Sequence, residues 1–165
     1  MKLSTSQIGR CGELLAQYLL LLRGIDSAPM TTDMGIDLVA YSPISGVATT
    51  IQVKANLKAK PGGGKGKLAL DWWMPVNCPA QLIALVDLSA HRLWLLKTEE
   101  IEGLAQQRSG GRFHLYMYTD SSVRPLRIGR SVYSHEFEKY LLENRVQELF
   151  GAGEEAILAG HGEPS

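Results

Sequence analysis

The sequence contains few cysteines, and they are not arranged for cross-linking or for metal binding. Its 165 residues include only two cysteines, Cys11 and Cys78, and four scattered histidines, with no Cys-x-x-Cys pair. Neither a disulfide framework nor a zinc site of the usual spacing is therefore expected. Two ordinary thiols are typical of a reducing compartment, so we expect a cytoplasmic protein.

An excess of charge of either sign is also missing. Lys plus Arg and Asp plus Glu each number 17, so the formal net charge at pH 7 is zero. This balance argues against a protein that coats nucleic acid through a uniformly basic surface. It does not exclude an enzyme that acts on nucleic acid, because a local basic patch is enough for binding.

No hydrophobic run is long enough to span a membrane. The longest, residues 14–22, contains Gln17, follows Glu13 and is not followed by a convincing signal-peptide cleavage site. No nucleophile elbow supports a Ser–His or Cys–His hydrolase. Residues 62–67 are rich in glycine, but Leu68 stands where a phosphate-binding P-loop needs a hydroxyl.

The most informative stretch that the sequence does contain is residues 35–54. Two apolar, β-rich runs there flank residues 42–46, Ser-Pro-Ile-Ser-Gly, which have the composition of a hairpin connection. Asp37 falls inside the first run, and Gln52 and Lys54 share one face at the end of the second. Antiparallel pairing then brings Asp37 beside Gln52 and Lys54. Because a buried charge needs a partner or a metal, this arrangement indicates either a structural Asp–Lys ion pair or an active site.

Periodicity, capping residues and chain breakers predict the remaining elements. A chain of this length, with 45% hydrophobic and 21% charged residues, can bury the core of one domain. We expect an α/β domain over residues 1–150, with a mixed central sheet flanked by helices, and a loose tail over 151–165. The predicted elements are a helix from Ser4 or Ser6 to Arg23, an extended segment at 25–32, strands at 36–41, 48–53, 81–88, 92–97 and 113–119, a flexible loop at 55–67, and helices at 99–107 and 134–150.

The first predicted helix carries Glu13 on its polar side. Arg10 and Gln17 lie three and four residues away, on the same side of the helix. A solvated carboxylate paired with Arg10 would account for Glu13 without any function. The polar residues of the hairpin downstream favour an active-site role instead.

Glu13 on a helix, Asp37 in a hairpin and the pattern Gln52-x-Lys54 stand in the order of the motifs of the PD-(D/E)xK nuclease superfamily. Gln52 is a departure, since the family usually has a carboxylate at that position. The four residues that correspond to the family's catalytic set are Glu13, Asp37, Gln52 and Lys54.

Three segments carry this resemblance: residues 9–13 (GRCGE), 35–39 (GIDLV) and 51–54 (IQVK). They look like the archaeal Holliday-junction-resolvase and restriction-endonuclease branches of the superfamily, and the resemblance extends over roughly residues 5–90. It implies a restriction-endonuclease-like αβββαβ core and a metal-dependent endonuclease that hydrolyses phosphodiester bonds of DNA. A homodimer is expected as well, because two sites related by a two-fold axis most simply cut two strands.

The resemblance also implies a role for each site residue. Mg²⁺, for which Mn²⁺ can substitute, would be bound by Asp37, the amide oxygen of Gln52, the backbone carbonyl of Val53 and Glu13. Lys54 would orient or deprotonate the attacking water, or stabilise the pentacovalent phosphate. Oxygen ligands of this kind are those that Mg²⁺ prefers.

A basic, glycine-rich segment follows the proposed site. Its lysines either neutralise DNA phosphates or belong to a solvated surface loop. Trp72 and Trp73 likewise belong either to the core or to a surface that stacks on bases. The lysines predicted to bind nucleic acid are Lys58, Lys60, Lys65 and Lys67.

Two other functions remain compatible with the sequence. A catalytically inactive nucleic-acid-binding module would keep the basic segment and use Asp37 and Lys54 as a structural pair. A subunit of a DNA-processing or defence complex would act through protein contacts and would have no affinity for DNA.

Overall fold

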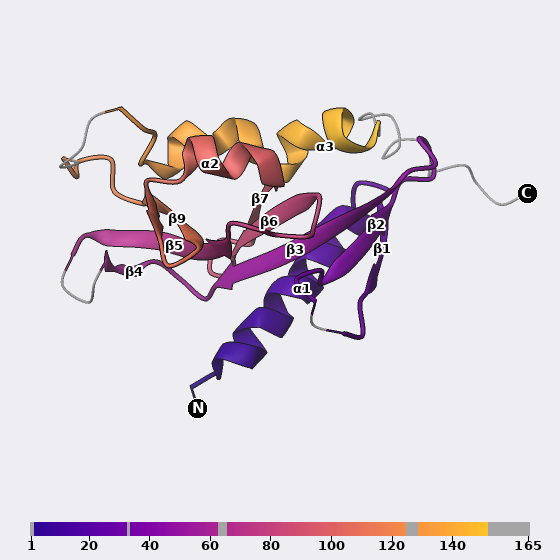
Figure 1. The fold of residues 1–165 in the computed structure, drawn as a ribbon, viewed down its shortest axis with the longest axis horizontal. Coiled ribbons are helices and arrows are strands. Elements are labelled where there is room, and N and C mark those ends of the chain that lie inside the picture. Colours follow the sequence, from indigo (N-terminus) through magenta and orange to yellow (C-terminus); the bar gives the residue numbers. More distant parts are fainter. Residues whose placement is uncertain (1, 33, 63–65, 125–128, 152–165) are drawn as a thin grey trace, which may run out of the picture.

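The computed structural model describes residues 2–32, 34–62, 66–124 and 129–151. These residues form two β-sheets with helices packed around them (Figure 1). In chain order the elements are α1 (Thr5–Leu21), β1 (Asp26–Pro29), β2 (Leu38–Tyr41), β3 (Ala48–Asn56), β4 (Lys60–Pro61), β5 (Leu68–Pro75), β6 (Leu82–Asp87), β7 (Arg92–Lys97), the 3₁₀ helix η2 (Thr98–Glu100), α2 (Ile101–Leu104), β8 (Gln107–Ser109), β9 (Arg112–Tyr118), the 3₁₀ helix η3 (Ser134–Tyr140) and α3 (Leu142–Phe150).

The larger sheet is mixed and has the strand order β1-β2-β3-β6-β7. Strands β3 and β6 are parallel, with Ile51 opposite Leu82, and the other neighbours are antiparallel. Parallel neighbours need a crossover connection, which is usually a helix. Here the chain between β3 and β6 forms β4 and β5 instead. The crossover therefore carries the beginning of a second sheet.

The second sheet is antiparallel and has the order β4-β5-β9-β8. Its strands alternate between a buried and a more exposed face, as the pleat requires. On β5, Trp72 is 3% exposed and Trp73 is 38% exposed. The sequence left open whether this pair is in the core or on the surface, and each alternative applies to one of the two residues. Trp72 belongs to the core and Trp73 to the outer face of the sheet.

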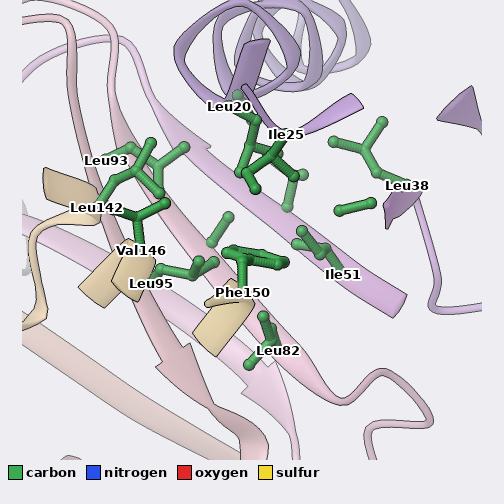
Figure 2. Close-up of a cluster of buried hydrophobic side chains, with 14 of the residues drawn as sticks. Leu20, Ile25, Leu38, Ile51, Leu82, Leu93, Leu95, Leu142, Val146 and Phe150 are labelled. Carbon is green, nitrogen blue, oxygen red and sulfur yellow. The ribbon is translucent and has the colours of Figure 1, made fainter. Parts of the chain in front are cut away.

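Two hydrophobic cores lie on opposite faces of the larger sheet. On one face, residues of α1 and α3 pack over the strands, and Figure 2 shows Leu20, Ile51, Leu95 and Phe150 meeting there. On the other face, Ile83 and residues of β7 pack against the inner face of the second sheet, together with α2 and η3. The larger sheet is thus buried on both sides, which explains why β6 is apolar at nearly every position.

Helix α1 begins with a capping box, in which Ser4 and Gln7 exchange side-chain to backbone hydrogen bonds. Its fully buried residues are Gly12, Ala16 and Leu20, which lie four apart. Helical spacing with Leu15, Leu19 and Leu22 predicts that Tyr18 is buried as well, and this prediction is wrong, because Tyr18 is exposed. The middle of the helix lies so close to β3 that only small side chains fit there, and the many leucines of the helix do not reveal which face this is.

Three predicted segments differ from the observed ones. The predicted helix at 99–107 is one 3₁₀ turn followed by the four residues of α2, and Gln107 begins β8. The predicted helix at 134–150 is divided at Leu141, whose backbone is not helical. In the predicted loop at 55–67, β3 continues to Asn56, and Lys60–Pro61 pair with β5.

The predicted C-terminal tail lies outside the described residues from 152 onward. Gly151 ends α3 in the left-handed conformation, with a φ of 65°, as glycine commonly does after a helix. Among the described residues, none of the helices combines the length and the apolar character that a bilayer crossing requires.

Candidate active site

Asp37 marks the place where β2 and β3 separate. Its backbone N–H donates to the carbonyl of Ile51 at 2.9 Å, which is the last backbone hydrogen bond between the two strands on this side. The next donor on β3, the N–H of Val53, donates to the Asp37 carboxylate oxygen Oδ2 at 2.6 Å. Asp37 stands one residue before β2, whereas it was predicted inside the strand. The Asp37 side chain thereby accepts a hydrogen bond from β3 at the point where backbone hydrogen bonding between β2 and β3 ends.

Gly35 allows the chain to turn away from β3 just before Asp37. Its φ is +79°, and a Cβ added there would lie 3.0 Å from the Cδ of Pro79. Both the left-handed backbone and the contact with Pro79 exclude most side chains. The sequence Gly35-Ile36-Asp37 thus positions the carboxylate by means of backbone geometry.

Gln52 lies one residue beyond the last paired position of β2 and β3, at which Leu38 is opposite Ile51. A Cβ added at Gly35 would lie 3.6 Å from the Gln52 Nε2, so the amide is near the turn that precedes Asp37. The Gln52 side chain is 5% exposed, and its Oε1 accepts from the Cys78 thiol, with Sγ and Oε1 3.6 Å apart. The amide is therefore held from the side of the β5–β6 connection.

The next two residues of β3, Val53 and Lys54, supply a backbone carbonyl and a lysine side chain at the place where β2 and β3 separate. Within a strand, the N–H and C=O of one residue point toward the same neighbouring strand. Since the Val53 N–H meets Asp37, the Val53 carbonyl lies on the same edge. Lys54 is half-buried and shares the face of Gln52, because residues two apart on a strand point the same way.

Glu13 approaches from the other face of β3. Helix α1 packs against the side of β3 that carries Val53 and Ala55, and a Cβ added at Gly12 would lie 2.4 Å from the Ala55 Cβ. The Glu13 side chain is 26% exposed, and it accepts a hydrogen bond from Arg10 at 2.7 Å. The structure therefore places Gln52 and Lys54 on one face of β3 and Glu13 on the helix that packs against the opposite face, while the Asp37 carboxylate meets β3 at the Val53 N–H.

The predicted DNA-binding lysines are divided among several places. Lys58 is exposed directly after β3, Lys60 is in β4 and Lys67 precedes β5. Lys65 lies outside the described residues. Lys60 and Lys67 line a pocket of ≈ 410 Å³ on the second sheet, together with residues of β5 and β9.

The sequence-based prediction missed the other residues of this pocket. Asp71 and His114 lie on neighbouring strands there, with His114 Nε2 and Asp71 Oδ2 3.2 Å apart. The alternation of residues 113–118, Phe-His-Leu-Tyr-Met-Tyr, carries the signal, because every second residue is polar or aromatic with a polar tip. Asn56 connects the two sites: it is buried at the end of β3 and donates from Nδ2 to the Asp71 backbone carbonyl at 2.6 Å.

The Asp37 carboxylate and the Val53 carbonyl are oxygen donors, which suit a hard divalent cation. Mg²⁺ typically takes one or two carboxylates and keeps several waters. The described residues contain no group of three or more His, Cys, Asp or Glu side chains placed to hold a metal. Asp37 and the Val53 carbonyl are oxygen donors of the kind that such a cation prefers.

The chain resembles known proteins at the level of structure. No protein-family model matches the sequence, and no curated protein matches it. A bacterial homing endonuclease, I-Ssp6803I, superposes with a TM-score of 0.59 at 17% identity, covering 93% of this chain and 98% of the other. The Holliday junction resolvase Hjc of Archaeoglobus fulgidus gives a TM-score of 0.45 at 18% identity, covering 72% of this chain and 88% of the other.

The likeness to the homing endonuclease extends over nearly the whole of both chains, so it concerns the complete domain, the second sheet included. At this level of identity it bears on the fold. The predicted fold class is confirmed: the chain is a mixed α/β domain, with a central mixed sheet flanked by helices, and its fold is restriction-endonuclease-like.

Proposed function

We propose that this protein is a metal-dependent endonuclease that hydrolyses phosphodiester bonds of DNA. The observation that carries the proposal is the hydrogen bond from the Val53 N–H to the Asp37 carboxylate, which holds this carboxylate at the residue between Gln52 and Lys54, where β2 and β3 separate. The order of these residues resembles that of the PD-(D/E)xK motifs, and the fold is the one on which those motifs occur. A homing endonuclease shares this fold over nearly its whole length, which is consistent with the proposed chemistry.

Asp37 is the principal metal ligand in this proposal. A carboxylate offers about four lone-pair sites, so the bond from the Val53 N–H is compatible with a cation at the same group. The Val53 carbonyl and the Gln52 amide oxygen complete the protein ligands, and Mn²⁺ can replace Mg²⁺. When bound, the cation neutralises charge at phosphorus and stabilises the leaving oxygen.

Lys54 acts on the attacking water or on the phosphate. Its ammonium group is half-buried, where Coulomb interactions are screened less than in bulk solvent. From the face that it shares with Gln52, it orients the water or stabilises the pentacovalent phosphate. The ammonium would also neutralise part of the negative charge that gathers there.

Glu13 has a supporting role and acts through water. It lies on the helix that covers the opposite face of β3, and Arg10 already pairs with it. Its carboxylate would compensate for the charge that a glutamine at position 52 does not supply. Loss of Glu13 is therefore expected to reduce metal affinity less than loss of Asp37.

The active form is a homodimer in this proposal, and helix α1 provides the surface. Four large apolar residues at the exposed side and C-terminal end of α1 have exposed fractions of 51%, 58%, 64% and 53%. Such a stripe favours contact with another apolar surface, and a two-fold axis would pair it with its own copy. The stripe consists of Leu14, Tyr18, Leu21 and Leu22.

The test is cleavage of supercoiled plasmid and of a four-way junction in Mg²⁺, Mn²⁺ or EDTA. Wild type should cut in either metal and not in EDTA, and Asp37→Ala and Lys54→Ala should each abolish cutting. Preference for the junction would assign a resolvase-like role, and preference for the plasmid a restriction-like role. Wild type that cuts neither substrate in either metal would overturn the proposal.

A catalytically inactive nucleic-acid-binding module is the second candidate. Two observations favour it: the Gln52 amide oxygen accepts from Cys78, and Glu13 pairs with Arg10. Both side chains are therefore engaged without a metal. Salt-sensitive DNA binding by a wild type that never cuts would select this candidate, whereas no DNA affinity at low salt would select a protein-interaction subunit.

A further inference from the structure

The outer face of the second sheet carries a continuous row of aromatic rings. Trp73 and His114 are stacked across β5 and β9, with ring centroids 4.1 Å apart and planes 2° apart. His114 and Tyr116 follow at 5.5 Å, and Tyr116 and Tyr118 at 5.4 Å. Residues two apart on β9 share this face, and the residues between them are buried in the core. Packing of the domain interior accounts for the inner residues of β9 and leaves the outer rings unexplained.

The rings of β9 in this row, His114, Tyr116 and Tyr118, form one side of the pocket of ≈ 410 Å³. Its volume lies within the range of about 300–1,000 Å³ that is usual for small-molecule sites. Lys60 and Lys67 line the pocket as well, close to Gly66, whose N–H donates to the Gly62 carbonyl. A Cβ at Gly66 would lie 2.5 Å from that carbonyl oxygen, so position 66 requires glycine.

The polar groups of the pocket are arranged for hydrogen bonding. The Asp71 carboxylate lies 3.2 Å from His114 Nε2 and lines the pocket beside the rings. The Nδ1 atom of His114 is buried and has no hydrogen-bond partner in the part of the chain that the structure describes.

Together, these groups match the parts of a nucleotide. Aromatic faces stack on bases, and this stacking is tolerant of sequence. Lysines neutralise phosphates, and a carboxylate accepts from the exocyclic amino group of a base. A paired base in a duplex exposes only its edges in the grooves, so stacking on these rings needs an unpaired base.

The pocket is coupled to the candidate active site through β3. Asn56 follows Lys54 by two residues, about 7 Å along the strand, and its side chain donates to the backbone carbonyl of Asp71 at 2.6 Å. One buried side chain of β3 thus joins the strand of the candidate active site to β5, which lines the pocket.

We propose that this pocket, lined by Tyr116, Tyr118, His114, Asp71, Lys60 and Lys67, holds an unpaired nucleotide of a DNA strand. That the same strand is the substrate rests on the proposed nuclease function, whereas binding itself does not. The protein would accordingly prefer DNA with a single-stranded or distorted segment next to the cleavage site.

The test measures binding in EDTA, where no cutting takes place. Fluorescence anisotropy with a labelled single-stranded 20-nucleotide oligomer is compared for wild type, Tyr116→Ala and Tyr116→Phe. Tyr116→Ala should weaken binding about 5- to 150-fold, as loss of one base-stacking ring does, whereas Tyr116→Phe keeps the ring and should bind as wild type does. Tyr41→Ala removes an exposed tyrosine from β2 and serves as the matched control. Thermal melts establish that each variant is folded.

The salt dependence of the same binding tests the lysines. For single strands the slope of log K against log salt changes by about 0.7 for each phosphate contact. Lys60→Ala combined with Lys67→Ala should therefore flatten the slope by about 1.4. Lys139→Ala, which removes a lysine of η3, should leave the slope unchanged.

Three outcomes would overturn the proposal: equal binding by wild type and Tyr116→Ala, binding of duplex only, or binding of free thymidine monophosphate as tight as that of the oligomer. The last outcome would indicate a site for a free nucleotide. Tyr116-dependent binding by a protein that never cuts would support the pocket and overturn the nuclease function alone. If the protein cuts DNA but Tyr116→Ala binds the oligomer as tightly as wild type, the nuclease function is supported and the pocket proposal is overturned.

Discussion

The carboxylate of Asp37 accepts a hydrogen bond from the backbone N–H of Val53 at 2.6 Å, in the position that the next backbone bond of the β2–β3 ladder would occupy. One side chain therefore ends the pairing of two strands and lies where a metal ligand is proposed. The Asp37 carboxylate thus has a structural role as a hydrogen-bond acceptor and a proposed role as a metal ligand. Substitutions that change its charge and its shape independently can separate the two roles.

Asp37→Asn is expected to remove metal binding and keep the fold. Asparagine still offers an oxygen to the Val53 N–H but carries no charge. Asp37→Ala removes the acceptor as well, which costs about 1–3 kcal/mol of unfolding free energy. Denaturant unfolding and calorimetric Mg²⁺ titration measure the two effects, with the exposed Asp26→Asn as control. Equal loss of stability in Asp37→Asn and Asp37→Ala would contradict this division of roles.

Gln52→Glu is expected to tighten metal binding and to lower stability without metal. The side chain at position 52 is almost fully buried beside Asp37, so a second carboxylate there is desolvated and repelled. Added Mg²⁺ or Mn²⁺ should raise its melting temperature more than that of wild type. Unchanged metal affinity in calorimetry would show that Gln52 is not a ligand.

Gly12→Ala is expected to destabilise the protein although alanine favours a helix by about 1 kcal/mol. The new Cβ would lie 2.4 Å from the Ala55 Cβ, which forces α1 away from β3. Overpacking of this kind typically costs about 1–3 kcal/mol. Ala55→Gly should restore part of the loss, so the double-mutant cycle measures the contact. Gly9→Ala, where the added Cβ meets nothing within 4 Å, is the control and should stabilise the helix.

Glu100→Gln is expected to destabilise the domain by about 1.5–3 kcal/mol, because charged hydrogen bonds to a buried cation are lost. Arg145 on α3 is 6% exposed and donates to both carboxylate oxygens of Glu100, at 3.0 and 3.1 Å. Glu102→Gln, in the exposed pair with Arg108, should cost less than about 1 kcal/mol. Similar losses of unfolding free energy for the two variants, measured in urea, would contradict the expectation that the buried pair stabilises the domain more than the exposed one.

Leu21→Glu is expected to convert the proposed dimer into a monomer. Leu21 is the most exposed residue of the apolar stripe on α1, at 64%, and a charge there would face its own copy across a two-fold axis. Sedimentation velocity measures the change, and Ile44→Glu in the β2–β3 turn is the control. A wild type that sediments as a monomer at all concentrations would contradict the dimer.

The sequence by itself determined most of the strands and the neighbourhood of Asp37 and Gln52. Alternation and turn composition are local properties, and a slip of one residue in the hairpin would move Leu38 and Ile51 off the buried face. The approach of Asp37 to the end of β3 follows from that hairpin. The order of helix, hairpin and Gln-x-Lys pattern was likewise enough to predict the fold class.

Only the tertiary structure decided which face of each element is used. The leucine-rich α1 is apolar on several sides, and the close approach of Gly12 to Ala55 selects the buried one. The same packing sets Glu13 on the opposite face of β3 from Lys54. The pocket on the second sheet depends on β5 meeting β9, whose partners are about forty residues apart in the sequence, with Trp73 opposite His114. Local periodicity specifies a face for each strand, but contacts between distant strands determine which side chains meet.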